Sequence, residues 1–311
     1  MKLIEEILTM AHLNRASDLH LTPNEFVTLR IDGALHKTKL LLTGELLSKI
    51  VTYLLNEEQY FLLEQGQEID CAYVDIKHRP YRINVAKSLG RFNVTIRLIN
   101  PKVPTCEELL LPQEVCNLAE LKQGLVLVCG ATGCGKSTTL ASLINKINCE
   151  RKVHIITLED PIEYRHQNKQ ALVHQREVGS DTASFVKGLR SALRQDPDVI
   201  LVGELRDKET TAAALTAAET GHLVFATLHS REATGAINRI LDMFDEGRSL
   251  ICSQFANVIE GIVCQELVLK EEGGGRRATF EVLLATPALR SLIREGRSHQ
   301  INGYQMIKYY K

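Results

Sequence analysis

The sequence predicts an α/β protein in which a domain with a mainly parallel sheet and a phosphate-binding loop follows a smaller α+β domain. Three observations support this fold class. Four short apolar runs alternate with segments of helical periodicity after residue 113, and a glycine-rich segment directly follows the first run. The first 100 residues combine an amphipathic helix with several short extended runs. Buried strands that alternate with helices are typical of a parallel sheet covered on both faces.

The region 1–100 is expected to form the α+β domain. Its apolar residues at positions 3, 4, 7, 8 and 11 predict an amphipathic first helix. Asp32-Gly33 stands between two extended runs, which is a strong hairpin signal. Residues 44–65 have a helical pattern, and three runs within 69–99 predict successive strands.

A proline-rich stretch, "NPKVPTCEELLLP", predicts a linker over residues 101–112, and the second domain is then expected to span 113–311. Its four apolar runs are "GLVLVCG", "KVHIITLED", "DVILVGE" and "HLVFATLH". A further hairpin is expected in 267–284 and a short helix near 287–295. Ligands of such parallel sheets bind at the carboxyl ends of the strands.

The composition is that of a soluble globular protein, with 44% apolar and 24% charged residues among 311. A formal net charge of -1 indicates no general attraction to nucleic acid or anionic lipid, so a nucleic-acid translocase is disfavoured. Glu5 and Glu6 interrupt the apolar start, which argues against a signal peptide, and no run of about 18 apolar residues predicts a membrane span. The eight scattered cysteines favour reduced thiols, a cytosolic location and no structural zinc site.

The segment "CGATGCGKSTTL" fits the phosphate-binding P-loop pattern, and it lies between a predicted strand and a predicted helix. Its glycines let consecutive backbone N–H groups face an anion, Lys136 would reach the β- and γ-phosphates, and the Ser137 hydroxyl would bind Mg²⁺. Cys134, beside Lys136 and the phosphate, is expected to have a lowered pKa and to be reactive. The alternative is a plain glycine-rich turn. The predicted nucleotide-binding residues are Gly130, Ala131, Thr132, Gly133, Cys134, Gly135, Lys136, Ser137 and Thr138.

Hydrolysis of a nucleotide also requires a carboxylate that orients water. Glu204 follows the apolar run 199–202, which would deliver it to the same sheet edge as the P-loop, although it could instead be a helix N-terminal carboxylate. Position 203 is glycine, so the aspartate familiar at this strand end is absent.

The run "ITLEDPIEY" places Glu159, Asp160 and Glu163 at the end of another strand, where they could bind Mg²⁺ or water. His229 ends the run "HLVFATLH" and is a candidate for contact with the γ-phosphate. His222 starts the same run and would lie at the opposite end of the strand.

These segments resemble a known family. "GATGCGKSTTL", "LEDPIEY", "DPDVILVGELRD" and "TGHLVFATLH" resemble, in order, the Walker A, Asp, Walker B and His boxes of type II secretion and type IV pilus ATPases. "ASDLHL" at 16–21 resembles the signature of their N-terminal PAS-like domain, and "HQREVGSDTASF" at 174–185 is similar to the segment after the Asp box. "ALRSLIRE" at 288–295 resembles a motif of the PilT-type pilus retraction ATPases, which this chain resembles most within the superfamily. On the residues alone, this last segment is an amphipathic helix with Leu289, Leu292 and Ile293 facing inward.

The resemblance implies a RecA-like ATPase domain, a homohexamer, and ATP with Mg²⁺ bound between the two domains. It also implies that Glu204 is the general base, that Glu163 assists at Mg²⁺ or water, and that His229 contacts the γ-phosphate. Arginines of the N-terminal domain would contact the nucleotide, with Arg82 and Arg97 the best matches and Arg91 a third candidate. The alternative for Arg82 and Arg97 is ordinary salt bridging.

The resulting hypothesis is a cytoplasmic motor that hydrolyses ATP and pulls on an inner-membrane pilus platform protein during type IV pilus retraction and twitching motility. One alternative is a pilus-assembly or secretion motor of the same superfamily. Another is a regulatory or scaffold protein that binds ATP with negligible turnover.

Overall fold

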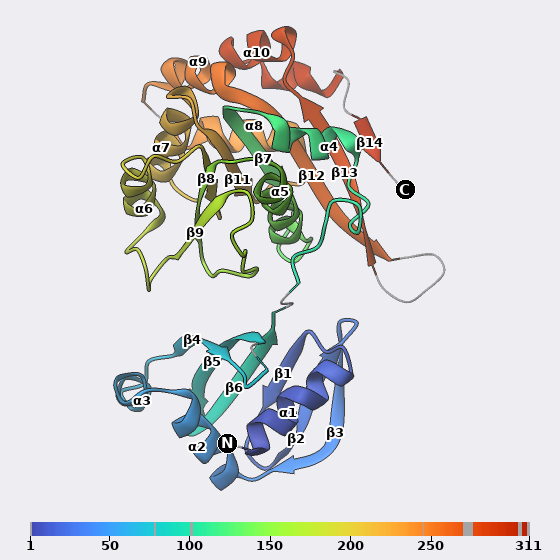
Figure 1. The fold of residues 1–311 in the computed structure, drawn as a ribbon, viewed down its shortest axis with the longest axis vertical. Coiled ribbons are helices and arrows are strands. Elements are labelled where there is room, and N and C mark those ends of the chain that lie inside the picture. The colour runs from blue at the N-terminus through green and yellow to red at the C-terminus, as the bar shows by residue number, and fades with distance from the viewer. Residues whose placement is uncertain are drawn as a thin grey trace. The chain divides into compact units, whose positions relative to one another are not determined.

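The computed structural model describes residues 2–77, 79–99, 102–244, 246–269, 276–303 and 307–309. The chain divides into two compact units, unit 1 (Met1–Lys102) and unit 2 (Val103–Lys311), and each has its own sheet (Figure 1). Position 101 of the expected linker and positions 270–275 of the expected second hairpin lie outside the described residues. Within the expected linker, Cys106 and Leu111 pack into a hydrophobic core of unit 2.

Unit 1 is a six-stranded antiparallel sheet with three helices, in the strand order β3-β2-β1-β6-β5-β4. Its elements are α1 (Lys2–Leu13), β1 (Asp18–Leu21), β2 (Glu25–Ile31), β3 (Ala34–Leu42), α2 (Gly44–Leu54), α3 (Glu57–Glu64), β4 (Ile69–Val74), β5 (Pro80–Ser88) and β6 (Arg91–Leu98). Asp32 and Gly33 connect β2 to β3 with φ of +48° and +86°, the left-handed pair that a tight two-residue hairpin needs. The predicted hairpin is therefore confirmed.

The two faces of the unit 1 sheet differ because side chains alternate along each strand. In β1, Leu19 and Leu21 point into the hydrophobic core, which the buried faces of α1, α2 and α3 complete. Asp18 and His20 point to the other face, which is polar. Charged side chains of β5 and β6 share that face with Asp18.

Unit 2 contains an eight-stranded sheet in the order β14-β13-β12-β7-β11-β10-β8-β9. Its strands are β7 (Gly124–Cys129), β8 (His154–Glu159), β9 (Leu172–Glu177), β10 (Val199–Val202), β11 (Leu223–Leu228), β12 (Ile259–Leu269), β13 (Arg276–Leu284) and β14 (Ile307–Tyr309). Its helices are α4 (Gln113–Asn117), α5 (Lys136–Glu150), α6 (Phe185–Ala192), α7 (Lys208–Glu219), α8 (Ala233–Asp242), α9 (Arg248–Val258) and α10 (Pro287–Arg294), with short 3₁₀ helices η1 (Leu118–Glu120) and η2 (Ser298–Gly303). Strands β7 to β12 pair in parallel, whereas β13 and β14 are antiparallel additions at one side.

Helices cover both faces of this sheet. Leu125 and Leu127 of β7 pack with α6 to α10, whereas Val126 and Val128 pack with α4, η1 and α5. A strand buried on both faces reads as a continuous apolar run, which is why the four runs in the sequence predicted it. In α10, Leu289 and Ile293 are buried and Leu292 is partly buried, as its periodicity predicted. The predicted α/β fold class is confirmed.

The parallel register brings the ends of four strands to one edge of the sheet. Leu228 of β11 pairs with Cys129 of β7, and Val202 of β10 pairs with Ala226 of β11. On the other side of β10, Val202 pairs with Leu158 of β8. The segments that follow these strands therefore emerge side by side, and they are the ones that carry the predicted site residues.

Candidate functional site

The P-loop turns from the end of β7 into the first turn of α5. Gly130, Gly133 and Gly135 have φ of +148°, +76° and +93°, which side chains other than glycine rarely adopt. A Cβ at Gly130 would lie 2.5 Å from the main-chain oxygen of Gln265, and one at Gly135 would lie 2.8 Å from the Gln265 side-chain nitrogen. The loop ends at the N-terminus of a helix 15 residues long, where the backbone N–H groups favour an anion.

Lys136 closes the loop upon itself. Its Nζ donates hydrogen bonds of 2.9 Å to the carbonyl oxygens of Gly130 and of Ala131, so the ammonium lies inside the curve of the loop. Ser137 is exposed on the first turn of α5, as a hydroxyl that binds a metal ion must be. The Thr138 hydroxyl lies 2.9 Å from the Tyr164 hydroxyl, which joins the start of α5 to the segment after β8.

Gln265 is a residue of this site that sequence reasoning missed. It belongs to β12, beside β7, and it is only 3% exposed. Its amide nitrogen donates to the Cys134 carbonyl at 2.8 Å, and its amide oxygen accepts from the Thr139 hydroxyl at 2.7 Å. No local pattern marks it, because it reaches the loop across 131 positions of sequence.

The expectation for Cys134 is corrected. Its thiol is buried, and burial raises its pKa, although Lys136 acts in the opposite direction. Burial disfavours the charged thiolate, and this effect on the pKa of Cys134 is larger than the opposite effect of the Lys136 ammonium. Cys134 is thus a packing residue of the loop and not an activated thiol.

Glu204 and His229 meet at the shared strand edge. The His229 Nε2 atom lies 3.2 Å from Glu204 Oε1, and Arg206 Nε donates to Glu204 Oε2 at 2.8 Å. The Glu204 side chain is 14% exposed, whereas that of Arg206 is 61% exposed. The structure thus brings together two of the three predicted catalytic residues and adds Arg206, which the sequence reasoning did not single out.

Gly203 stands where the aspartate familiar at this strand end would be, and its neighbours lie close to it. A Cβ at Gly203 would lie 3.1 Å from the Leu158 carbonyl oxygen and 3.4 Å from Phe185, so a side chain at that position would crowd both neighbours. The Gly203 N–H donates to Leu158 O at 2.7 Å, and Leu205 N–H donates to Thr227 O at 3.0 Å. Glu204 therefore stands on a backbone that is tied to both neighbouring strands.

The Asp-box segment after β8 has a different environment. Glu159 accepts hydrogen bonds from the Thr157 hydroxyl at 2.7 Å and from the Gln175 amide at 3.1 Å, and burial raises its pKa to about 7. The Gln175 amide also donates to the Tyr164 carbonyl at 2.8 Å. Glu163 lies half-buried in the same segment.

Two further candidates, Asp160 and His222, share no hydrogen bond or ion pair with Glu204 or the P-loop in the part of the chain that the structure describes. Asp160 is exposed at the start of the Asp-box segment. His222 precedes β11 at the end opposite to His229, and its Nδ1 lies 2.8 Å from the Ala217 carbonyl oxygen. This contact links α7 to β11, so the structure offers a local structural role for His222.

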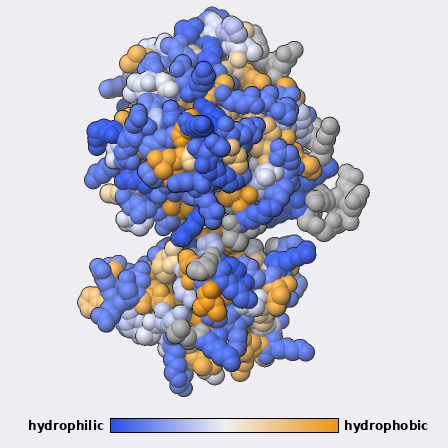
Figure 2. Space-filling model, viewed as in Figure 1, coloured by the Kyte–Doolittle hydropathy of each residue, from blue (hydrophilic) through white to orange (hydrophobic). Residues whose placement is uncertain are grey.

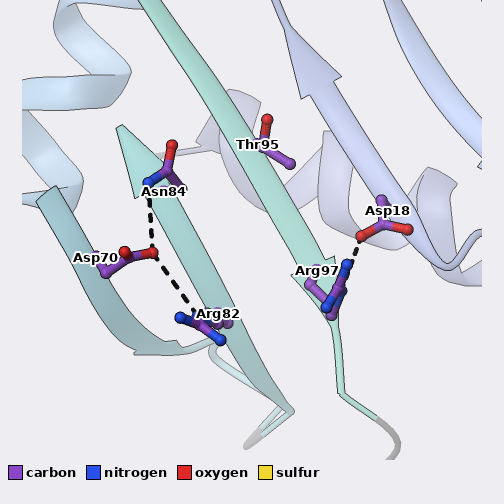
Figure 3. Close-up of a pocket in the computed structure, with 6 residues that line it drawn as sticks. All are labelled: Asp18, Asp70, Arg82, Asn84, Thr95 and Arg97. Atoms are coloured by element: carbon purple, nitrogen blue, oxygen red, sulfur yellow. Dashed lines mark hydrogen bonds and ion pairs between the residues drawn. The ribbon is translucent and has the colours of Figure 1, made fainter. Parts of the chain in front are cut away.

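The arginine candidates lie on unit 1. Arg82 of β5 and Arg97 of β6 are cross-strand neighbours and line one pocket with Asp18, Asp70, Asn84 and Thr95 (Figure 3). Arg97 Nε donates to Asp18 at 2.9 Å, and Arg82 Nε lies 3.7 Å from Asp70. Arg91 starts β6 at the far end of the strand, roughly 20 Å from Arg97 at about 3.4 Å per residue. The structure thus groups Arg82 with Arg97 and separates Arg91 from them.

The face of the molecule seen in Figure 2 is largely hydrophilic, with smaller apolar areas between. Among the described helices, each is too short or too polar to cross a bilayer.

A glycine-lined loop between a central parallel strand and a helix, with a lysine inside it and a glutamate–histidine pair at the next strand ends, defines an α/β protein of the P-loop nucleotide-binding class. The family model described as "Type II/IV secretion system protein" matches residues 1–308. The chain belongs to this family, and the membership that its motifs predicted is confirmed.

Individual proteins are similar to this chain over most of its length. The type IV pilus retractation ATPase PilT of Pseudomonas aeruginosa is 41% identical over 300 residues, which cover 96% of this chain and 87% of that protein. A twitching motility protein of Neisseria gonorrhoeae is 43% identical over 277 residues, which cover 88% of this chain and 74% of that protein. The crystal structure of the pilus retraction motor PilT with bound ADP superposes with a TM-score of 0.90 at 42% identity, covering 96% of this chain and 87% of that one.

Proposed function

We propose that this protein is an ATPase motor that drives type IV pilus retraction, and that it works as a homohexamer at the cytoplasmic side of the inner membrane, against a pilus platform protein. The observation that carries the proposal is the Glu204–His229 pair at the sheet edge that also bears the P-loop. Binding alone needs only the loop, whereas hydrolysis also needs a group that orients the attacking water and donors that stabilise the charge developing on the phosphate, and Glu204 and His229 can supply these. Likeness to PilT over 96% of the chain supports retraction as the work performed.

The chain's own residues divide the chemistry as follows. Backbone N–H groups of the P-loop and the N-terminus of α5 bind the phosphates, and Lys136 exchanges its two carbonyl partners for phosphate oxygens. Glu204 orients the attacking water and accepts its proton. His229, which contacts Glu204 in the structure, donates toward the γ-phosphate as negative charge develops.

Mg²⁺ is the expected companion of ATP. The exposed Ser137 hydroxyl would bind it, with the half-buried Glu163 reaching it through water, and hard oxygen ligands of this kind fit the ion. When bound, the ion neutralises phosphate charge.

Phosphate release tests the enzymatic part of the proposal. The wild type is expected to release phosphate from ATP, and Lys136→Ala is expected to abolish release and to weaken ADP binding. Release by the wild type at the level of Lys136→Ala would instead favour a nucleotide-binding scaffold protein.

Deletion of the gene in its host tests the direction of the work. Loss of twitching with excess surface pili is expected for a retraction motor. Loss of surface pili would instead identify an assembly motor of the same family.

A further inference from the structure

We propose that Gln265 is a positioning residue that holds the P-loop in its phosphate-binding form when Lys136 turns toward a phosphate. The inference rests on the proposed nucleotide-binding function and assigns a role in it to a residue of β12. It follows from two sets of hydrogen bonds that hold different halves of the loop.

Lys136 holds the first half. Its ammonium donates to the carbonyl oxygens of Gly130 and Ala131, both at 2.9 Å. An ammonium has three donors, and a bound β- or γ-phosphate competes for them with charge-assisted hydrogen bonds that are stronger than those to neutral carbonyls. Phosphate binding therefore loosens the contacts that Lys136 makes with the loop.

Gln265 holds the second half through contacts that a phosphate does not contest. Its amide nitrogen donates to the Cys134 carbonyl, and its amide oxygen accepts from Thr139 on α5. Both ends of one planar amide are thus used, one on the loop and one on the helix that follows it. The Cys134 carbonyl and the first turn of α5 are consequently held together by the span of one amide group.

The glycines of the loop make room for this contact. The main-chain oxygen of Gln265 lies 2.5 Å from where a Cβ on Gly130 would be, and its side-chain nitrogen lies 2.8 Å from where a Cβ on Gly135 would be. Gln265 itself is anchored in the sheet, opposite Phe280 of β13 and one residue after Cys264, which pairs with Cys129 at the end of β7. The loop is therefore braced by a strand that stays in the sheet whatever Lys136 contacts.

The test replaces Gln265 by methionine, which keeps the length of the side chain and removes both hydrogen bonds. ADP binding by Gln265→Met is expected to weaken about tenfold, because the buried Cys134 carbonyl loses its donor and the loop its brace. The KM for ATP should rise by a similar factor while kcat stays within about threefold, since Gln265 touches no reacting atom. A merely structural role would lower the melting temperature and leave the ADP dissociation constant unchanged.

Two controls isolate the contact. Glu266→Gln changes the next residue of β12, which is exposed on the opposite face, and should bind ADP as the wild type does. Thr139→Val keeps the bond from Gln265 to the loop and removes the one to the helix, so its effect should be smaller than that of Gln265→Met. If Gln265→Met does not fold, Gln265→Asn serves instead, because its side chain stays uncharged and is too short to reach both Cys134 and Thr139.

This inference would be overturned, and the proposed function left intact, if the Gln265 variants bound ADP as tightly as the wild type while Lys136→Ala bound it more weakly. A wild type that fails to bind ADP would overturn both.

Discussion

Glu159 ends β8 and Glu204 follows the neighbouring parallel strand β10, yet the two glutamates have different partners. Glu204 has a cationic guanidinium at 2.8 Å and a histidine at 3.2 Å. Glu159 has two neutral donors, Thr157 and Gln175, and burial raises its pKa to about 7. Two carboxylates at the same sheet edge can thus have different chemical surroundings, because the neighbouring side chains differ and not the position along the strand.

The largest expected difference between the two glutamates is in turnover. Glu204→Gln should lower kcat about 10²–10⁴-fold, the usual contribution of a general base. Glu159→Gln keeps a side chain that can accept from Thr157 and should change kcat less than about fivefold. Phosphate release under saturating ATP measures both variants, and ADP binding checks that each site is intact. Equal losses of kcat in the two variants would show that the two glutamates do not differ in their roles.

The second difference concerns stability against pH. Because the pKa of Glu159 is raised in the folded protein from a usual value of 4.5 to about 7, the folded state binds more protons than the unfolded state between these pH values. Stability from this group therefore falls as pH rises through that window, by at most about 3 kcal/mol, and levels off above pH 7. The wild type alone loses this stability as the pH rises. The melting temperature of Glu159→Gln minus that of the wild type should therefore be more positive at pH 8 than at pH 5. A difference that does not vary with pH would show that Glu159 is ionised throughout.

A smaller effect is expected where the Asp-box segment touches the P-loop helix. Tyr164→Phe removes the hydroxyl that contacts Thr138 and should lower turnover about two- to fivefold, the worth of one ordinary hydrogen bond. Tyr53→Phe is the matched control, since it removes a tyrosine hydroxyl whose contact with Tyr73 lies within unit 1. If Tyr164→Phe and Tyr53→Phe have the same turnover, the segment does not act through this contact.

The smallest effect concerns thiol labelling. Burial outweighs the ammonium of Lys136 at Cys134, as burial outweighs hydrogen bonding at Glu159. Cys149 is exposed and accepts a hydrogen bond from Lys169 Nζ at 3.1 Å, so an alkylating reagent should modify it before Cys134. Mass spectrometry of peptides after brief alkylation gives the order. If Cys134 were modified faster than Cys149, the P-loop thiol would be activated as the sequence predicted.

Much of the site could be predicted from sequence because its signals are local. The spacing of Gly130, Gly135 and Lys136 is readable without a structure, and so are the apolar runs that deliver Glu204 and His229 to one edge. The rule that parallel strands end together sufficed to place Glu204 and His229 at one sheet edge, whereas their contact at 3.2 Å came from the structure. Arg206 could have been noticed as well, since it lies two residues from the predicted base.

The contacts that were missed join distant parts of the chain. Gln265 reaches the P-loop from β12, and Gln175 reaches the Asp-box segment from β9. The pKa of Cys134 depends on how tightly the loop is covered, which neighbouring charge in the sequence does not reveal.

The sequence by itself determined the class of ligand, the parallel sheet and the family, because glycine spacing, strand periodicity and ordered motifs are properties of short segments. Only the tertiary structure decided which carboxylate contacts Arg206, how closely the neighbours of Gly203 approach it, and what braces the loop. Those are properties of packing between β7, β8, β10 and β12, and packing follows from strand order, which a local pattern does not contain.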